Sequence, residues 1–106
     1  MAAASALAFL AAASMTLVAA PSASAADSSA CNSPWYGLNG HITGSGVNLR
    51  TGPGTKYASK GQLSKGTTFY FYCFKEYGYE GWDYLKVTSG PNKGVKGWVN
   101  DRYTKW

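Results

Sequence analysis

Closely spaced glycines restrict the fold of this chain more than any other feature of its sequence. Eleven of the 13 glycines, all except Gly37 and Gly40, lie after residue 41. The runs between them are short and rich in β-branched and aromatic residues, which is typical of strands in a sandwich or barrel. No stretch beyond the N-terminal segment repeats apolar residues at the i, i+3, i+4, i+7 spacing of a helix. The sequence therefore predicts an all-β domain over residues 41–106.

Residues 67–74 form the clearest predicted strand. Because successive side chains of a strand point to opposite faces, Phe69, Phe71 and Cys73 share one face. We expect this face to point into the core, because the phenolic hydroxyl groups opposite suit a wet surface. The wet face is predicted to carry Tyr70, Tyr72 and Phe74.

A second strand is predicted over residues 82–87. Leu85 and Val87 fit its core face, with Asp83 at the rim of that face. The opposite face would then present Trp82, Tyr84 and Lys86 to a ligand. Further along, we expect a strand at 95–100, a polar turn resembling one turn of 3₁₀ helix at 101–103, and a short closing strand at 104–106.

The N-terminal segment differs in composition from the rest. Residues 1–26 carry no charge, and residues 7–20 form an apolar run broken by Pro21. Ala-Ser-Ala at 23–25 is the small-x-small pattern that signal peptidase accepts, so residues 1–25 are predicted to be a secretory signal peptide. A single membrane anchor is the alternative, but the run is shorter than the ~20 residues that a span needs. No stable membrane span is expected after cleavage.

Two cysteines lie in the predicted mature chain. In an exported protein an even cysteine pair is most simply a disulfide, so we predict a bond between Cys31 and Cys73. A closed zinc site is the weaker alternative, because it needs four ligands and only His41 could join the two thiols. Residues 26–40 are small and polar, and we interpret them as a flexible leader that Cys31 tethers to the domain.

An ordered set of motifs runs through most of the predicted mature chain. The motifs are Asn-Leu-Arg-Thr-Gly-Pro-Gly at 48–54, Tyr57, Leu-Ser-Lys-Gly at 63–66, Gly-Trp-Asp-Tyr-Leu-Lys-Val at 81–87, and Gly-Trp-Val at 97–99 followed by Tyr103. In this order and at this spacing they resemble the bacterial SH3 family. The resemblance implies a small, partly open SH3-like barrel of five to seven short antiparallel strands, and a binding module rather than an enzyme.

The first of these motifs has a plausible structural role. Pro53 fixes φ and Gly52 permits a tight turn, so the motif can bend the long loop that follows the first strand. Arg50 offers five donors for the carbonyl groups of that loop or for a nearby carboxylate. Asn48 can bond the backbone locally, as short amides do in turns. We interpret these four residues as a structural loop motif.

The residues offer little for catalysis. His41 is the sole histidine and has no acid beside it to orient it as a base. Glu76 and Glu80 could form a carboxylate pair for glycoside hydrolysis, but both flank a Tyr-Gly-Tyr turn region and are better interpreted as solvated turn acids. No enzymatic activity, cofactor or metal is predicted.

The function expected from the resemblance is binding. It implies recognition of peptidoglycan peptides in a groove beside the long loop, by a secreted, extracellular or wall-associated protein. Exposed aromatic rings on a rigid barrel make good contact surfaces, and lysines pair with ligand carboxylates. The alternative is a secreted protein-binding factor or inhibitor that does not bind the wall. The predicted ligand-binding residues are Tyr57, Tyr70, Tyr72, Trp82, Tyr84, Lys56 and Lys60.

The charge balance leaves two interpretations open. All ten basic and all five acidic residues follow residue 26, for a net charge of +5. Such a surface attracts anionic partners, among them wall polymers, although plain solubility explains it equally well. Nucleic acid is not an expected partner, because export argues against it. The protein is expected to be a monomer.

Overall fold

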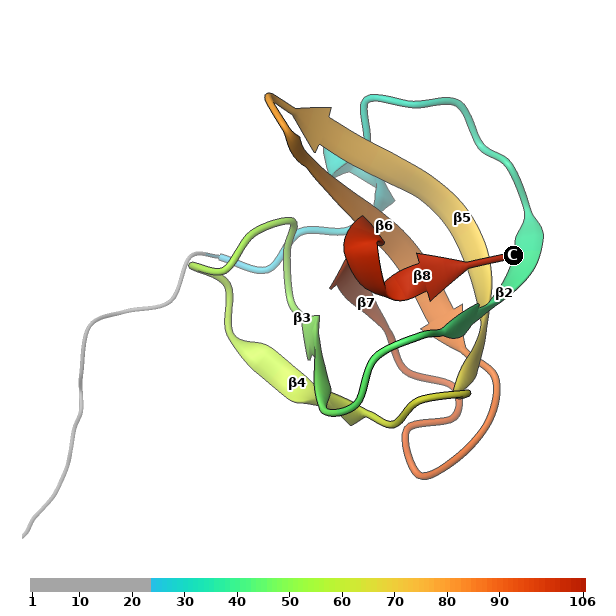
Figure 1. Cartoon of the computed structure of the whole chain (residues 1–106). Helices are drawn as coiled ribbons and strands as arrows, with labels where there is room; N and C mark the ends of the chain where they lie inside the picture. The colour runs from blue at the N-terminus through green and yellow to red at the C-terminus, as the bar shows by residue number, and fades with distance from the viewer. Residues whose placement is uncertain (1–23) are drawn as a thin grey trace, which may run out of the picture.

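The computed structural model describes residues 24–106, which fold into seven strands and two short 3₁₀ turns (Figure 1). Of the predicted signal peptide, residues 1–23 lie outside the described part of the chain. Within residues 24–106, no helix is long and apolar enough to cross a membrane. The elements are η2 (Ser28–Ala30), β2 (Leu38–Ile42), β3 (Val47–Arg50), β4 (Ser59–Leu63), β5 (Thr68–Tyr77), β6 (Glu80–Val87), β7 (Lys96–Asn100), η3 (Asp101–Tyr103) and β8 (Thr104–Lys105).

All seven strands belong to one curled sheet in the order β4-β3-β7-β6-β5-β2-β8. Every neighbouring pair is antiparallel. The two ends of this order, β4 and β8, remain unjoined, so the barrel is only partly closed (Figure 1). The predicted all-β, SH3-like class is confirmed.

A main apolar core fills the inside of the curled sheet. Phe69 and Phe71 of β5 face Val87 and Leu85 of β6 in the ladder, as their alternation predicted. Burying a side chain of this size stabilises a fold by about 1.5–3 kcal/mol. The other buried members come from β2, β3, β4 and β7, and are Ile42, Val47, Leu49, Leu63 and Val99.

A β-bulge changes the alternation in the middle of β5. Phe71 pairs with Leu85, whereas Cys73 pairs with Tyr84, so two steps along β5 match one step along β6. An extra residue of this kind swaps the faces of the residues that follow it. Phe74 therefore packs against the main core, and Cys73 joins a second cluster. The prediction that Cys73 shares the face of Phe71 is wrong for this reason.

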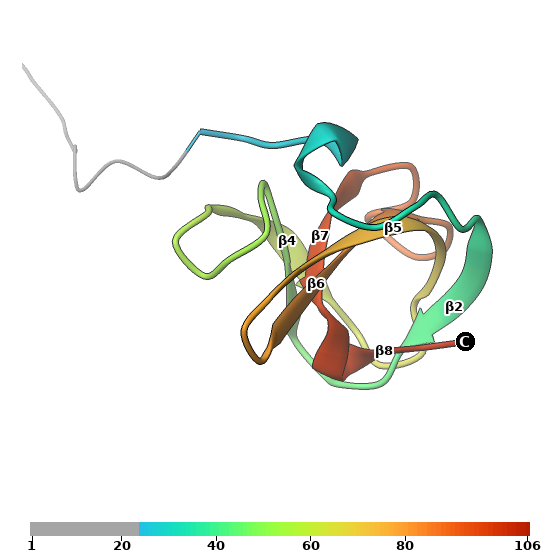
Figure 2. The ribbon, with the colours of Figure 1, turned by 90° about the horizontal axis from the view of Figure 1, so that it is seen from above.

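The second cluster lies on the other side of the sheet, under the leader. Its buried members are Cys73, Trp82, Tyr84 and Trp98. The predicted exposure of Trp82 and Tyr84 is wrong, because only 3% and 8% of their surfaces are accessible. Figure 2 shows the leader and η2 crossing this side of the sheet beside β5.

The leader is attached to the barrel by covalent and hydrogen bonds. The predicted Cys31–Cys73 disulfide is confirmed. Asn32 N donates to Phe74 O at 3.0 Å, and Tyr36 N donates to Tyr72 O at 2.7 Å. The segment that the composition suggested to be flexible thus follows β5, and β2 begins within it.

Candidate functional site

Side-chain hydrogen bonds and close packing hold the loop between β3 and β4, residues 51–58, in place. Arg50 Nη1 donates to Tyr57 O at 2.9 Å and to Thr55 O at 3.4 Å, both within this loop. The Tyr77 hydroxyl donates to Pro53 O. Gly52 is buried so closely against the Tyr57 ring that a Cβ atom there would collide with it. The loop is therefore a rigid wall for whatever lies beside it.

A hollow of about 370 Å³ lies next to this wall. Its other sides are the turn at 44–46, β3, the start of β6 and the turn η3. Asn48 and Arg50 reach it from β3, and Asn100 and Arg102 reach it from the opposite side. Asn48 Oδ1 accepts from Ser59 Oγ at 3.0 Å, which orients its amide.

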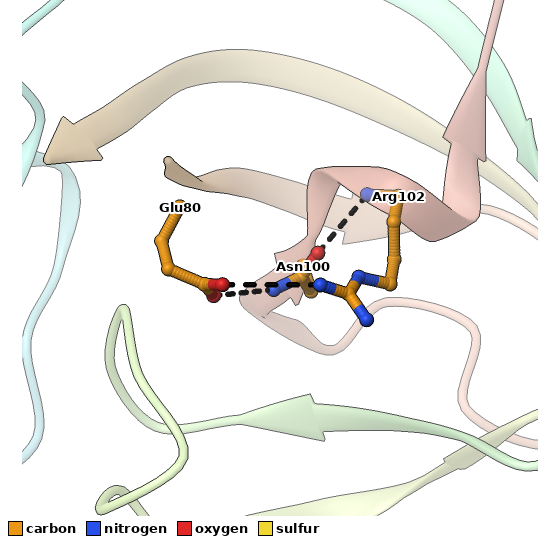
Figure 3. Close-up of polar contacts among 3 residues, drawn as sticks. All are labelled: Glu80, Asn100 and Arg102. Carbon is orange, nitrogen blue, oxygen red and sulfur yellow. Dashed lines mark hydrogen bonds and ion pairs between the residues drawn. The ribbon is translucent and has the colours of Figure 1, made fainter. Parts of the chain in front are cut away.

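Three polar side chains organise the far side of the hollow (Figure 3). Asn100 Nδ2 donates to Glu80 Oε1 at 3.0 Å, and Arg102 Nη2 lies 3.8 Å from Glu80 Oε2. Asn100 Oδ1 in turn accepts from Arg102 N at 3.0 Å, which caps η3. An exposed ion pair of this kind contributes only about 0–1 kcal/mol to stability. It does bring a donor and an acceptor together beside the hollow.

The polar groups around this hollow are of the kinds that bind a peptide backbone. The hollow presents amide, guanidinium and carboxylate groups, which together can donate to and accept from the peptide groups of an extended chain. No three His, Cys, Asp or Glu side chains within residues 24–106 come together in a way that could hold a metal ion. His41 is exposed on β2 opposite Lys105, away from this hollow.

The predicted aromatic groove lies on the other side of the loop and is covered. Tyr84 and Lys60 line a separate hollow of about 640 Å³ together with leader residues. Ala26 N donates to Thr51 O at 2.8 Å, and Ala26 O accepts from Trp98 Nε1 at 2.8 Å. The leader thus occupies the place where the sequence suggested that a ligand would lie on Tyr84.

The remaining predicted residues do not gather there. Tyr57 is half-buried within the loop, with Lys56 Nζ 5.8 Å from its ring centre. Tyr70 lies on the outer surface of β5 and meets Tyr72 edge to face, with ring centres 5.4 Å apart. Of the seven, only Trp82 also lines the hollow that contains Asn48 and Arg50.

Glu80, Asn100 and Arg102 line the hollow although they are not among the site residues predicted from the sequence. The sequence predicts Glu80 as a solvated turn acid, Asn100 as the last residue of the strand at 95–100, and Arg102 as part of the polar turn at 101–103. They meet because β6 pairs with β7, which sets Trp82 opposite Asn100. The strands predicted at 82–87 and 95–100 include the pairing segments. The meeting of these three side chains could be predicted only from the register between the two strands, which the sequence did not provide.

Comparisons with known proteins give a family. The family model of the bacterial SH3 domain matches residues 45–105. The chain is also similar to the uncharacterized protein YraI of Bacillus subtilis (strain 168), with 33% identity over 69 residues. That alignment covers 58% of this chain and 58% of YraI, so the chain spans less than two thirds of that relative's length. No solved structure matches the chain.

Proposed function

Because the chain belongs to the bacterial SH3 domain family, we propose that it is a secreted, non-catalytic module that binds peptidoglycan peptides. The observation that carries the proposal is the open polar hollow beside the loop at 51–58. Its groups come from rigid elements on both sides, so an extended peptide can bond to them without a large ordering cost.

Two further observations support a place outside the cell. The Cys31–Cys73 disulfide is of a kind that persists in oxidising compartments. The uncharged, alanine-rich segment ahead of residue 27 has the length and the ending of an export signal. The net charge of +5 would draw the protein toward anionic wall polymers before specific contacts form.

Retention on purified Gram-positive peptidoglycan tests the proposal. The wild type, Arg102→Gln and Lys93→Gln are compared at low and high salt. Both variants lose one positive charge from an exposed side chain, but only Arg102 lines the hollow. We expect retention that survives high salt and falls for Arg102→Gln alone. Trp82 and Tyr84 are unsuitable targets, because they are buried and their loss would damage the fold.

Other results would contradict the proposal in different ways. Equal losses for both variants, with release at high salt, would indicate a basic protein on an anionic polymer. No retention at all would refute wall binding. It would favour the second candidate function, an extracellular protein-binding factor, which the exposed rings of Trp35, Tyr36 and Trp106 support.

A further inference from the structure

Four of the five acidic residues gather at one end of this basic protein. Asp101 lies close enough to Glu76 and Glu80 for their charges to raise its pKa, although burial contributes more. Asp101 likewise contributes to the raised pKa of Asp83. The fifth acid, Asp27, lies in the leader. Within residues 24–106 the one ion pair joins Arg102 to Glu80, so the other three carboxylates at this end have no cation at contact distance.

Three of these carboxylates line one hollow of about 390 Å³. It lies across η3 from the polar hollow described above, since Asp101 and Thr104 face this side whereas Asn100 and Arg102 face the other. Aromatic rings make up most of its remaining wall. Its lining includes Glu76, Asp83, Asp101, Tyr36, Phe74 and Trp106.

Asp83 is the unusual member of this set. Its residue surface is only 3% accessible, yet no lysine or arginine pairs with it among the described residues. Thr104 Oγ1 donates to Asp83 Oδ2 at 2.6 Å, and no donor in residues 24–106 reaches Oδ1. A buried carboxylate with a free oxygen and no counter-charge is costly, so such groups are ordinarily paired. Asp83 Oδ1 therefore has an acceptor position available for a ligand.

We propose that this hollow binds the ammonium group of a lysine-type side chain on a peptide. The ammonium would donate to Asp83 Oδ1 and to the Asp101 carboxylate, and the exposed Glu76 would attract it from the edge of the hollow. The aliphatic stem would lie against the rings of Tyr36, Phe74 and Trp106, whose faces also attract a cation. This site is separate from the hollow assigned to peptidoglycan peptides and does not depend on it.

The wall of the hollow favours an organic cation over a metal ion. The acidic side chains do not converge as a metal site requires, because no three ligating groups in the described part of the chain form one. A lysine-type side chain needs instead a carboxylate end and an apolar channel. The exposed Trp106 ring, 4.7 Å from Phe71 centre to centre, and the Tyr36 ring, 6.0 Å from Phe74, give the hollow an apolar lining for such a stem.

Titration followed by amide NMR shifts tests this inference on the protein expressed from its full sequence. The probe is Nα-acetyl-lysine N-methylamide, and the matched neutral probe is Nα-acetyl-norleucine N-methylamide. We expect saturable shifts at Asp83, Asp101 and Thr104 with the lysine probe. The norleucine probe should bind at least about 10-fold more weakly, which corresponds to 1.4 kcal/mol.

Charge-matched variants make the test specific. Asp101→Asn removes a carboxylate at the edge of the hollow and should weaken lysine binding by about 10-fold, the loss of one charge-assisted bond. Asp27→Asn removes the same charge from the exposed leader and should leave binding unchanged. Equal binding of both probes, equal effects of both variants, or no saturable shift at these amides would each overturn the inference. A failure to bind peptidoglycan would leave it standing.

Discussion

Asp83→Asn should make the protein more stable at neutral pH. Burial raises the pKa of Asp83 from 3.8 to about 6, against the lowering effect of its hydrogen bond from Thr104. The fold therefore favours the neutral carboxyl group. Its contribution to stability is fully present below pH 3.8 and is lost as pH rises through about 6. An asparagine is neutral at every pH and can still accept the Thr104 bond through its side-chain oxygen.

The size of the effect follows from the shift in pKa. A change of one unit corresponds to 1.36 kcal/mol, so a shift of about two units gives about 3 kcal/mol at most. The new amide donors of asparagine need acceptors, and Asp101 is a negatively charged group that acts on this position. We therefore expect a gain in unfolding free energy of about 1–3 kcal/mol at pH 7.5. Each kcal/mol of added unfolding free energy raises the midpoint of thermal unfolding of a domain of this size by about 4–8 °C.

Thermal unfolding of the wild type and Asp83→Asn between about pH 3 and 8 measures this gain in stability. The difference between Asp83→Asn and the wild type should grow as pH rises through about 6 and vanish near pH 3. Asp101 has a raised pKa too, and because it is present in both proteins, its titration largely cancels in the difference, apart from its charge coupling to Asp83. A lower midpoint for Asp83→Asn at pH 7.5, or a difference independent of pH, would refute the reasoning.

Asp27→Asn supplies a control of opposite sign. Hydrogen bonds from Ser29 lower the pKa of Asp27, so its contribution to stability is present above pH 3.8 and is lost as pH falls. Its replacement should remove a small stabilisation at neutral pH instead of adding one. Because Asp27 is fully exposed, we predict only the sign of the change in unfolding free energy for this variant.

Three other outcomes follow from the leader and the turns. Cys31→Ser should lower the unfolding free energy by about 2–5 kcal/mol in urea titrations, because the bond closes a loop with a sequence separation of 42; an unchanged midpoint would contradict this. Trp98→Phe removes the donor to the leader carbonyl, so amide exchange in the leader should speed up more than exchange in β3. Gly81→Ala should destabilise, because the added Cβ meets the Asp101 carboxylate, and Asp101→Ala in the same chain should relieve most of that loss in a double-mutant cycle.

The parts of the fold that depend on local signals could be predicted from the sequence. The turn at 101–103 is η3, and the strand predicted at 95–100 differs from β7 by one residue at its start. Turn residues and alternation act over a few positions, so they are visible in one chain. Phe69, Phe71, Leu85 and Val87 were placed in the core on that basis, and all four are buried.

The candidate site depends on longer-range relations that the sequence did not reveal. The bulge after Phe71 is defined by how β5 pairs with β6. No residue of β5 by itself predicts the bulge. Trp82 and Tyr84 alternate as an exposed face should, but the leader that Cys31 attaches covers them. Alternation predicts which residues share a face, and it says nothing about what packs on that face.

The buried charge of Asp83 connects stability with the proposed lysine-type ligand. If the unliganded carboxylate costs the fold up to about 3 kcal/mol at neutral pH, an ammonium group that pairs with it should recover part of that cost. Saturating Nα-acetyl-lysine N-methylamide should then raise the wild-type unfolding midpoint at pH 7.5 and narrow its gap to Asp83→Asn. The norleucine probe should leave the gap as it is. If the lysine probe leaves the difference between the two unfolding midpoints unchanged, the stability effect of Asp83 would be independent of ligand binding. Asp83 would then be a costly buried charge with no part in binding.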